Sequence, residues 1–220
     1  MKKIVFCLPG QQFSGRFLQS WTSLLYACME KDIQPMLSQH YSPLLYYVRN
    51  MCLGGNNLSG VDQKPFQGRA DYDYIMWIDS DIVFTPNQLF KLIEDDKDIV
   101  SGLYMMSDNK HFATVETWDE EFFKKNGYFP FLTPQTIRGK YEPFKVDYTG
   151  FGWMLIKRGV FESLQYPWFQ PLFKEYEING KTVKDFTMED VAFCHLVKEK
   201  GYDIWIDPTV RVGHEKTVVL

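Results

Sequence analysis

The sequence predicts an α/β fold with a central, mostly parallel sheet flanked by helices. The first observation is the segment Tyr74–Ile78, an unbroken apolar run typical of a strand buried on both faces. The second is the alternation of strand patterns with helical patterns near the N-terminus, which indicates parallel α/β units. The 220 residues contain no linker, repeat or low-complexity segment, so we expect one domain over residues 1–220.

The first half of the chain is expected to alternate strands with helices. In order, we expect a strand over 4–8, a helix over 15–31, a strand over 33–39, a helix opened by 41–43 and ending near 53, a long loop over 54–71, the strand at 74–78, a helix over 86–94 and a strand over 98–103. Ser14 and the Thr85-Pro86-Asn87 segment precede two of these helices and are expected to cap them.

The second half is expected to be less regular. We expect a strand over 112–117, irregular chain over 119–145, a strand over 146–157 interrupted by glycines, a helix over 159–164, a helix from Thr187 to about Lys200, a strand over 203–206 and a tail over 208–214. Gly201 follows the last of these helices and is expected to end it. A glycine inside a strand marks a bulge or a close approach of the backbone to a ligand.

Asp79-Ser80-Asp81 stands directly after the buried strand and is the strongest candidate site. Ligands of parallel α/β sheets bind beyond the carboxyl ends of the strands. Residues i and i+2 of an extended segment point the same way, so both carboxylates can address one point. Two carboxylates with a hydroxyl between them suit Mg²⁺ or Mn²⁺ bound to a phosphate. The structural alternative is a turn or helix cap, for which Asp and Ser are also common.

The bulk composition limits the class of partner. The net charge is −4 and there is no long basic run, which argues against nucleic acid. An anionic substrate would therefore need a local site or a cation. No apolar run approaches transmembrane length. The four cysteines form no CxxC pair, so we expect reduced, mostly buried thiols and a cytoplasmic location.

Four features occur together and in order. They are the Pro9 turn, Asp79-Ser80-Asp81, the segment Gly150-Phe151-Gly152-Trp153, and Met188-Glu189-Asp190 followed by His214. Together they resemble the GT-A glycosyltransferases, which use nucleotide-sugars and a divalent metal, and the resemblance covers nearly the whole chain. The segment around Trp77–Asp81 also looks like the small glycosyltransferases of chlorella viruses, which would place the protein in the host cytoplasm.

The resemblance implies roles for the acidic residues. Asp81 would bind the metal, Asp79 would contact the metal, its water or the ribose, and His214 would complete the metal shell; a histidine ligand favours Mn²⁺ over Mg²⁺. Glu189 and Asp190 would border the acceptor as catalytic residues. Each role has a structural alternative: His214 as a surface histidine, and Asp190 as part of a capping box with Thr187. Adjacent helical residues diverge by about 100°, so one carboxylate can face the acceptor while the other caps or pairs.

The resemblance also implies a donor-binding set. It comprises Pro9, Gly10, Gln11, Tyr41, Arg49, Asp79, Ser80, Asp81, Gly150, Gly152 and Trp153. Arg49 would contact the base or a phosphate, or else end a helix in solvent. Trp153 would stack on the sugar or only pack in the core.

The resulting hypothesis is a hexosyltransferase that uses a UDP-sugar of the UDP-glucose, UDP-galactose or UDP-rhamnose type and a glycan or protein-linked sugar acceptor. UDP is inferred from the resemblance alone. The alternatives are a nucleotidyltransferase acting on sugar phosphates and a non-catalytic nucleotide-sugar-binding domain. The sequence leaves open the donor sugar, the acceptor and the stereochemistry of transfer.

Overall fold

A seven-stranded sheet forms the centre of the computed structural model, which describes residues 1–216. In spatial order its strands are β2 (Ile33–His40), β1 (Lys2–Pro9), β3 (Tyr74–Ile78), β9 (Trp153–Lys157), β5 (Ile99–Leu103), β12 (Ile204–Arg211) and β7 (Phe144–Val146). β9 runs antiparallel to both its neighbours and β7 runs antiparallel to β12, so five of the seven strands share one direction. The predicted α/β class with a mostly parallel sheet is confirmed.

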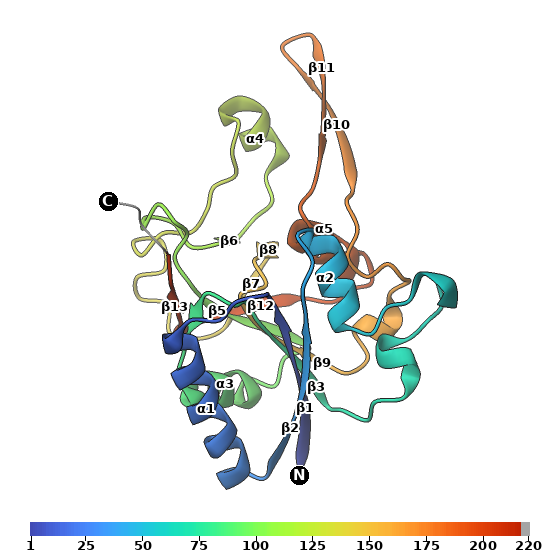
Figure 1. Ribbon diagram of the computed structural model, residues 1–220. Helices are drawn as coiled ribbons and strands as arrows, with labels where there is room; N and C mark the ends of the chain where they lie inside the picture. The colour runs from blue at the N-terminus through green and yellow to red at the C-terminus, as the bar shows by residue number, and fades with distance from the viewer. Residues whose placement is uncertain (217–220) are drawn as a thin grey trace.

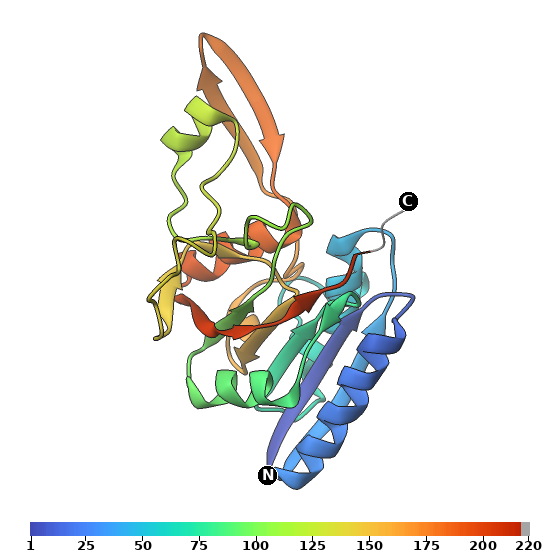
Figure 2. The ribbon, with the colours of Figure 1, turned by 90° about the vertical axis from the view of Figure 1, so that its left-hand side faces the viewer.

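Helices cover both faces of this sheet (Figures 1 and 2). Helices α1 (Gly15–Glu30) and α3 (Pro86–Glu94) pack side by side on one face, and α2 (Leu45–Cys52) and α5 (Glu189–Glu199) cover the other. Alternate residues of β3 serve the two faces. Ile75 and Trp77 belong to the core beneath α2 and α5, whereas Tyr74, Met76 and Ile78 belong to the core beneath α1 and α3. β3 is therefore buried on both faces, as its apolar run predicts.

The expected helix caps are present at α1 and α3. The Ser14 hydroxyl accepts a hydrogen bond from the Phe17 N–H at 3.1 Å. At α3 the backbone N–H of Thr85 donates to the Gln88 side chain at 2.6 Å, as in a capping box. The predicted bounds of both helices agree with the observed ones within about two residues.

A long hairpin was missed at the sequence level. Strands β10 (Phe173–Ile178) and β11 (Lys181–Phe186) pair antiparallel and project beyond the carboxyl edge of the sheet (Figure 1). Asn179 and Gly180 form the turn, and both have positive φ, 52° and 72°. An Asn-Gly pair between two strands is the strongest short-range signal for such a hairpin, so this hairpin was predictable from the sequence.

The expectation of irregular chain over 119–145 is partly wrong. This stretch contains α4 (Glu120–Asn126), which packs against the hairpin through Phe123 and Tyr176, whose ring centroids are 5.3 Å apart. The expected strand over 146–157 is divided among β7, β8 (Tyr148–Thr149) and β9. The expected strand at 112–117 shrinks to β6 (Thr114–Val115), and the expected helix at 159–164 shrinks to η3 (Phe161–Ser163).

The remaining short elements flank the site. The long loop contains η1 (Asn57–Ser59), a single 3₁₀ turn, and η2 (Pro65–Gly68), in which Phe66 and Gln67 have positive φ of 55° and 56°. The tail is not loose. β12 extends to Arg211, and β13 (Gly213–His214) pairs antiparallel with β4 (Ile82–Val83). This pairing sets His214 opposite Ile82, one residue after Asp81. The four cysteines are free and buried, as expected, and none of the described helices is both long and apolar enough to cross a membrane.

Candidate functional site

A pocket of about 310 Å³ opens at the carboxyl ends of β1, β2 and β3. It is lined by Pro9, Gly10, Gln11, Tyr41, Ser42, Leu45, Val48, Asp79, Ser80 and Asp81. Most residues of the predicted donor-binding set thus lie together around one cavity. The parallel order β2-β1-β3 explains this convergence, because the carboxyl ends of these three strands meet at one edge. We refer to this cavity as the strand-end pocket.

Gly10 lets the first turn pass close to Ser80 at this pocket. A Cβ on Gly10 would lie 2.7 Å from the Ser80 Cβ, and Gly10 has a φ of +157°. The backbone of the β1 turn therefore contacts the Asp79-Ser80-Asp81 segment without an intervening side chain. Only a glycine permits this approach.

Arg49 connects the two sets of predicted acidic residues. Its Nη1 and Nη2 atoms donate to the two carboxylate oxygens of Asp79 at 3.1 and 3.3 Å, and its Nε donates to Glu189 Oε1 at 3.0 Å. Arg49 is only 2% exposed and Glu189 only 1%. The guanidinium also lies over the rings of Trp77 and Phe151, at 5.5 and 5.0 Å from their centroids.

The charges around Arg49 fix its protonation state. Burial lowers the pKa of Arg49, but the carboxylates of Asp79 and Glu189 outweigh burial and raise this pKa above its usual range. Arg49 does not line the strand-end pocket but lies behind Asp79. Each of its three nitrogens donates to a carboxylate, so it acts here as a positioning residue for Asp79 and Glu189.

Asp190 lies beside this pair but in a different environment. It is half-buried, and its Oδ2 accepts a hydrogen bond from the Tyr148 hydroxyl at 2.9 Å, while its Oδ1 accepts from the Val191 N–H at 2.8 Å. Burial and the nearby charge of Glu189 raise the pKa of Asp190 to about 6. A carboxylate that titrates near neutral pH is suited to accept a proton.

The capping-box alternative for Thr187 and Asp190 does not describe this helix. The N-cap residue of α5 is Met188, and no side chain caps it. The Thr187 hydroxyl instead accepts a hydrogen bond from the Leu172 N–H at 3.0 Å, at the base of the hairpin. One of the two adjacent carboxylates, Glu189 and Asp190, was expected to form an ion pair or a cap, and Glu189 is the one that pairs, with Arg49.

Asp81 and His214 meet on the outer side of the strand-end pocket. His214 Nε2 lies 3.0 Å from Asp81 Oδ2, and Lys216 Nζ donates to the same oxygen at 2.6 Å. Burial raises the pKa of Asp81, but the hydrogen bonds with His214 and Lys216 outweigh it and lower this pKa to about 2. The hydrogen bond with Asp81 raises the pKa of His214.

These two residues fit one side of a metal site. His214 Nδ1 lies 2.6 Å from the Met105 carbonyl oxygen, which only accepts, so Nδ1 carries a proton and Nε2 faces Asp81. A metal-binding histidine usually donates its other ring N–H to such a carbonyl. Within residues 1–216, no group of three or more His, Cys, Asp or Glu side chains is placed to hold a metal ion. Further ligands would therefore have to come from a phosphate or water.

The glycine segment packs closely against Tyr104. A Cβ on Gly150 would lie 2.1 Å from the Tyr104 hydroxyl oxygen, and one on Gly152 would lie 2.8 Å from the Tyr104 ring. The Gly152 N–H donates to that hydroxyl at 3.2 Å. Trp153 is fully buried and packs on Phe84, with ring centroids 4.7 Å apart. None of Gly150, Gly152 and Trp153 lines the strand-end pocket, although the Gly152 carbonyl oxygen accepts a hydrogen bond from the Asp79 N–H at 3.1 Å.

Comparison with known proteins identifies the fold. No protein-family model matches this chain, and no curated protein matches it. Among solved structures, the viral protein A197 from STIV is 16% identical with a TM-score of 0.58, over 99% of this chain and 87% of that one. GalNAc-T7 with UDP, GalNAc and Mn²⁺ is 14% identical with a TM-score of 0.56, over 99% of this chain and 43% of that one.

A third structure has the same fold. The Drosophila β-1,4-galactosyltransferase 7, a mutant in complex with manganese, UDP-Gal and xylobiose, is 12% identical with a TM-score of 0.51, over 99% of this chain and 72% of that one. The fold of this protein is therefore the GT-A fold of glycosyltransferases. At these identities the likeness establishes the fold alone, and the assignment of function depends on the site.

We expect Arg49→Met to destabilise the fold. The substitution leaves Glu189 buried without a counter-ion, and breaking a buried ion pair in this way costs about 3–5 kcal/mol. The free energy of unfolding from urea denaturation measures the effect. The double variant Arg49→Met/Glu189→Gln removes the stranded charge and should recover part of the loss. A single variant within about 1 kcal/mol of the wild type would show that the pair is not structurally important.

Proposed function

We propose that this protein is a metal-dependent glycosyltransferase that transfers a hexose or deoxyhexose from a UDP-sugar to a glycan or protein-linked sugar acceptor. The observation that carries the proposal is the convergence of two sites on one buried arginine. Arg49 joins Asp79, at the strand-end pocket, to Glu189, which is adjacent to the half-buried carboxylate of Asp190. A donor site and a proton acceptor thus lie on either side of one ion-pair network.

The donor half of the proposal uses the strand-end pocket. The nucleotide would lie among Pro9, Gly10, Gln11 and Tyr41, with the diphosphate toward Ser80 and Asp81. Asp81 and His214 would hold Mn²⁺, or Mg²⁺, together with the diphosphate oxygens. The metal would supply a Lewis acid that neutralises the charge of the departing nucleotide. Arg49 would hold Asp79 in position for the ribose or a metal-bound water.

The acceptor half uses Asp190. The acceptor hydroxyl oxygen forms a bond to the anomeric carbon of the sugar while the bond between that carbon and the diphosphate oxygen breaks. The hydroxyl proton passes to the Asp190 carboxylate, and UDP leaves with the bonding electron pair. Glu189, buried against Arg49, acts through Asp190, because its charge is one of the causes that raise the pKa of Asp190. This scheme corresponds to an inverting transfer.

The structural relatives agree with this proposal without deciding it. Two of them are complexes with Mn²⁺ or manganese together with UDP or UDP-Gal. The resemblance to chlorella-virus glycosyltransferases, a viral origin and a cytoplasmic location remain parts of the proposal.

One assay separates the proposal from its alternatives. UDP release from a panel of UDP-sugars is measured with Mn²⁺ and with EDTA. A glycosyltransferase should release UDP only with the metal, through slow hydrolysis when no acceptor is present. A nucleotidyltransferase would instead release diphosphate from a nucleoside triphosphate and a sugar phosphate, and a non-catalytic domain would bind UDP-sugar without turnover.

UDP binding should depend on the metal and on His214. Because the chain has a net charge of −4, a diphosphate needs a local cation. Calorimetric titration of UDP should show tight binding with Mn²⁺ and little binding with EDTA. His214→Ala should weaken the Mn²⁺ affinity of the UDP complex by roughly 10- to 100-fold. The matched control is His111→Ala, a half-exposed histidine paired with Asp108. Equal affinities for UDP with Mn²⁺ and with EDTA would contradict the metal role.

Asp190→Asn should lower transfer by about 10²–10⁴-fold, which is the usual range for loss of a general base. UDP binding should not change, because Asp190 does not line the strand-end pocket. Initial rates and UDP calorimetry on the same preparation measure both quantities. A variant with full activity would return Asp190 to a structural role, and a variant that loses UDP binding would place Asp190 in the donor site.

The pH dependence of the transfer rate should reflect the protonation of Asp190. The carboxylate must be unprotonated to accept a proton, so the rate should fall as the pH drops through about 6. Tyr148→Phe removes a hydrogen bond that stabilises the charged carboxylate, so the pKa of Asp190 should rise and the acidic limb should move to higher pH. Tyr141→Phe, at an exposed tyrosine, is the control. An acidic limb that does not move in Tyr148→Phe would exclude Asp190 as its source.

A further inference from the structure

A second cavity, of about 380 Å³, lies between α2, η1 and the segment 166–171. Its lining includes three tyrosines and three amide side chains, which are Tyr46, Tyr47, Tyr166, Asn50, Asn57 and Gln170. None of these residues belongs to the strand-end pocket. Its volume lies in the range of small-molecule sites, which is about 300–1,000 Å³. We refer to this cavity as the tyrosine pocket.

The lining has the chemistry that recognises a neutral sugar. Among residues 1–216, no Asp, Glu, Lys, Arg or His lines the tyrosine pocket, so these residues offer no counter-charge to an ionic ligand there. Aromatic faces offer apolar contact area to the C–H faces of a sugar ring, and the hydroxyl groups of a sugar can bond to amides and phenols. Tyr47 is 57% exposed, so its ring is available to a ligand.

Hydrogen bonds hold the walls of this pocket in place. The Asn50 amide nitrogen donates to the carbonyl oxygens of Tyr46 and Phe169 at 2.7 and 2.8 Å, and its oxygen accepts from the Phe169 N–H at 3.3 Å. Across the pocket, the Tyr166 hydroxyl donates to Asn57 Oδ1 at 2.5 Å. That bond leaves the Asn57 NH₂ group free of any partner in the described chain. A pre-formed wall reduces the entropy lost when a ligand binds.

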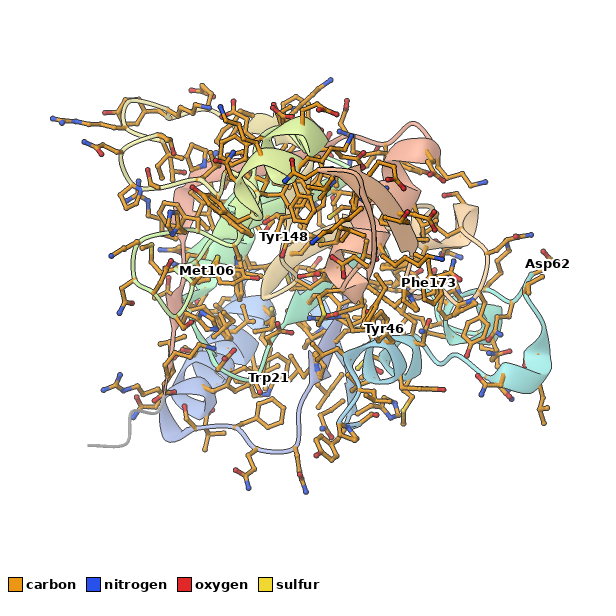
Figure 3. All side chains as sticks on the ribbon, turned by 90° about the horizontal axis from the view of Figure 1, so that it is seen from above. Trp21, Tyr46, Asp62, Met106, Tyr148 and Phe173 are labelled. Atoms are coloured by element: carbon orange, nitrogen blue, oxygen red, sulfur yellow. The ribbon has the colours of Figure 1, made fainter. Side chains whose placement is uncertain are left out.

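The tyrosine pocket is close to the proposed reaction centre. The Tyr46 hydroxyl donates to the Thr187 carbonyl oxygen at 2.5 Å, two residues before Glu189. Tyr46 also precedes Arg49 by three residues, about one helical turn, on α2. Figure 3 looks down on this edge of the molecule and shows Tyr46 on α2 between Trp21 and Phe173, with Tyr148 nearer the centre. A ligand in this pocket would thus lie beside the N-terminus of α5, which carries Asp190.

A shallow groove continues the tyrosine pocket away from the reaction centre. A cavity of about 680 Å³ shares Tyr47, Asn50, Asn57 and Tyr166 with it and extends to Met51 and Leu58. None of the described residues that line this groove carries a charged side chain. Because the two cavities share a wall and continue into one another, together they offer room for more than one sugar unit.

We propose that the tyrosine pocket and this groove bind a neutral oligosaccharide, which is the part of the acceptor that lies beyond the sugar to be modified. The inference rests on the proposed glycosyltransferase function, because it identifies the ligand as the acceptor. Tyr47 provides the stacking face, and Asn57 and Gln170 provide the hydrogen-bonding groups. The site determines which glycan is presented to Asp190, whereas the strand-end pocket determines the donor.

The test uses the full chain and an array of neutral and acidic oligosaccharides, followed by calorimetric titration of the strongest binder. We expect neutral oligosaccharides to bind in preference to acidic ones. Tyr47→Ala should weaken binding by about tenfold, which is the scale of one aromatic contact. Tyr26→Ala is the matched control, because Tyr26 is similarly exposed, at 63%, on α1 across the sheet. Asp81→Ala should keep full oligosaccharide affinity, since Asp81 lies in the other pocket.

Two outcomes would overturn the inference. They are the absence of neutral oligosaccharide binding by the wild type, and equal affinities for wild type and Tyr47→Ala. UDP calorimetry with Mn²⁺ on the same variants reports separately on the proposed function. If the protein binds UDP with Mn²⁺ but binds no oligosaccharide, the proposed function stands and the proposed oligosaccharide site is wrong. If the protein binds oligosaccharide through Tyr47 but binds no UDP with Mn²⁺, the oligosaccharide site stands and the proposed transferase function is wrong.

Discussion

The two ion pairs of Arg49 are the interaction on which the site depends. A buried guanidinium requires compensation, and here two carboxylates from distant parts of the chain provide it. One is Asp79, at the end of the central strand β3, and the other is Glu189, in the first turn of α5. Because Glu189 is buried, moving it away from Arg49 would leave a buried charge unpaired, so the network holds the helix that carries Asp190 near the strand end.

The same network gives the two adjacent carboxylates, Glu189 and Asp190, different environments. Glu189 is paired with Arg49 and buried, whereas Asp190 is half-buried and bonded only to a phenol and a backbone N–H. Burial and the charge of Glu189 raise the pKa of Asp190 to about 6, while Asp81, bonded to His214 and Lys216, has a pKa lowered to about 2. One carboxylate is thereby suited to accept a proton and the other to remain an anion beside a cation. Such separation of pKa values by environment is how one site assigns acid–base roles.

The sequence predicted what depends on local pattern and missed what depends on long-range contacts. The buried strand, the helix caps and the clustering of Pro9, Tyr41 and Asp79 at one edge follow from periodicity and parallel topology. Glu189, one of the two partners of Arg49, lies 140 residues away, and no local signal connects the two. From the sequence, Trp153 could either stack on a sugar or pack in the core, and only the fold shows that it is buried. The β10–β11 hairpin is a different case, because the local pair Asn179-Gly180 is by itself sufficient to predict a hairpin turn.

The eight-residue helix α2 contributes side chains to the strand-end pocket, to the tyrosine pocket and to the ion pairs of Arg49. Successive helical residues are rotated by about 100°, so each face of α2 addresses a different neighbour. Leu45 and Val48, three residues apart, face the strand-end pocket, while Tyr46, Tyr47 and Asn50 face the tyrosine pocket. Arg49 lies between these faces and reaches both Asp79 and Glu189. A donor in one pocket and a glycan in the other would therefore be held by opposite sides of one rigid helix. The ion pairs of Arg49 thus connect the helix that lines both pockets to Asp79 and to Glu189, the neighbour of Asp190.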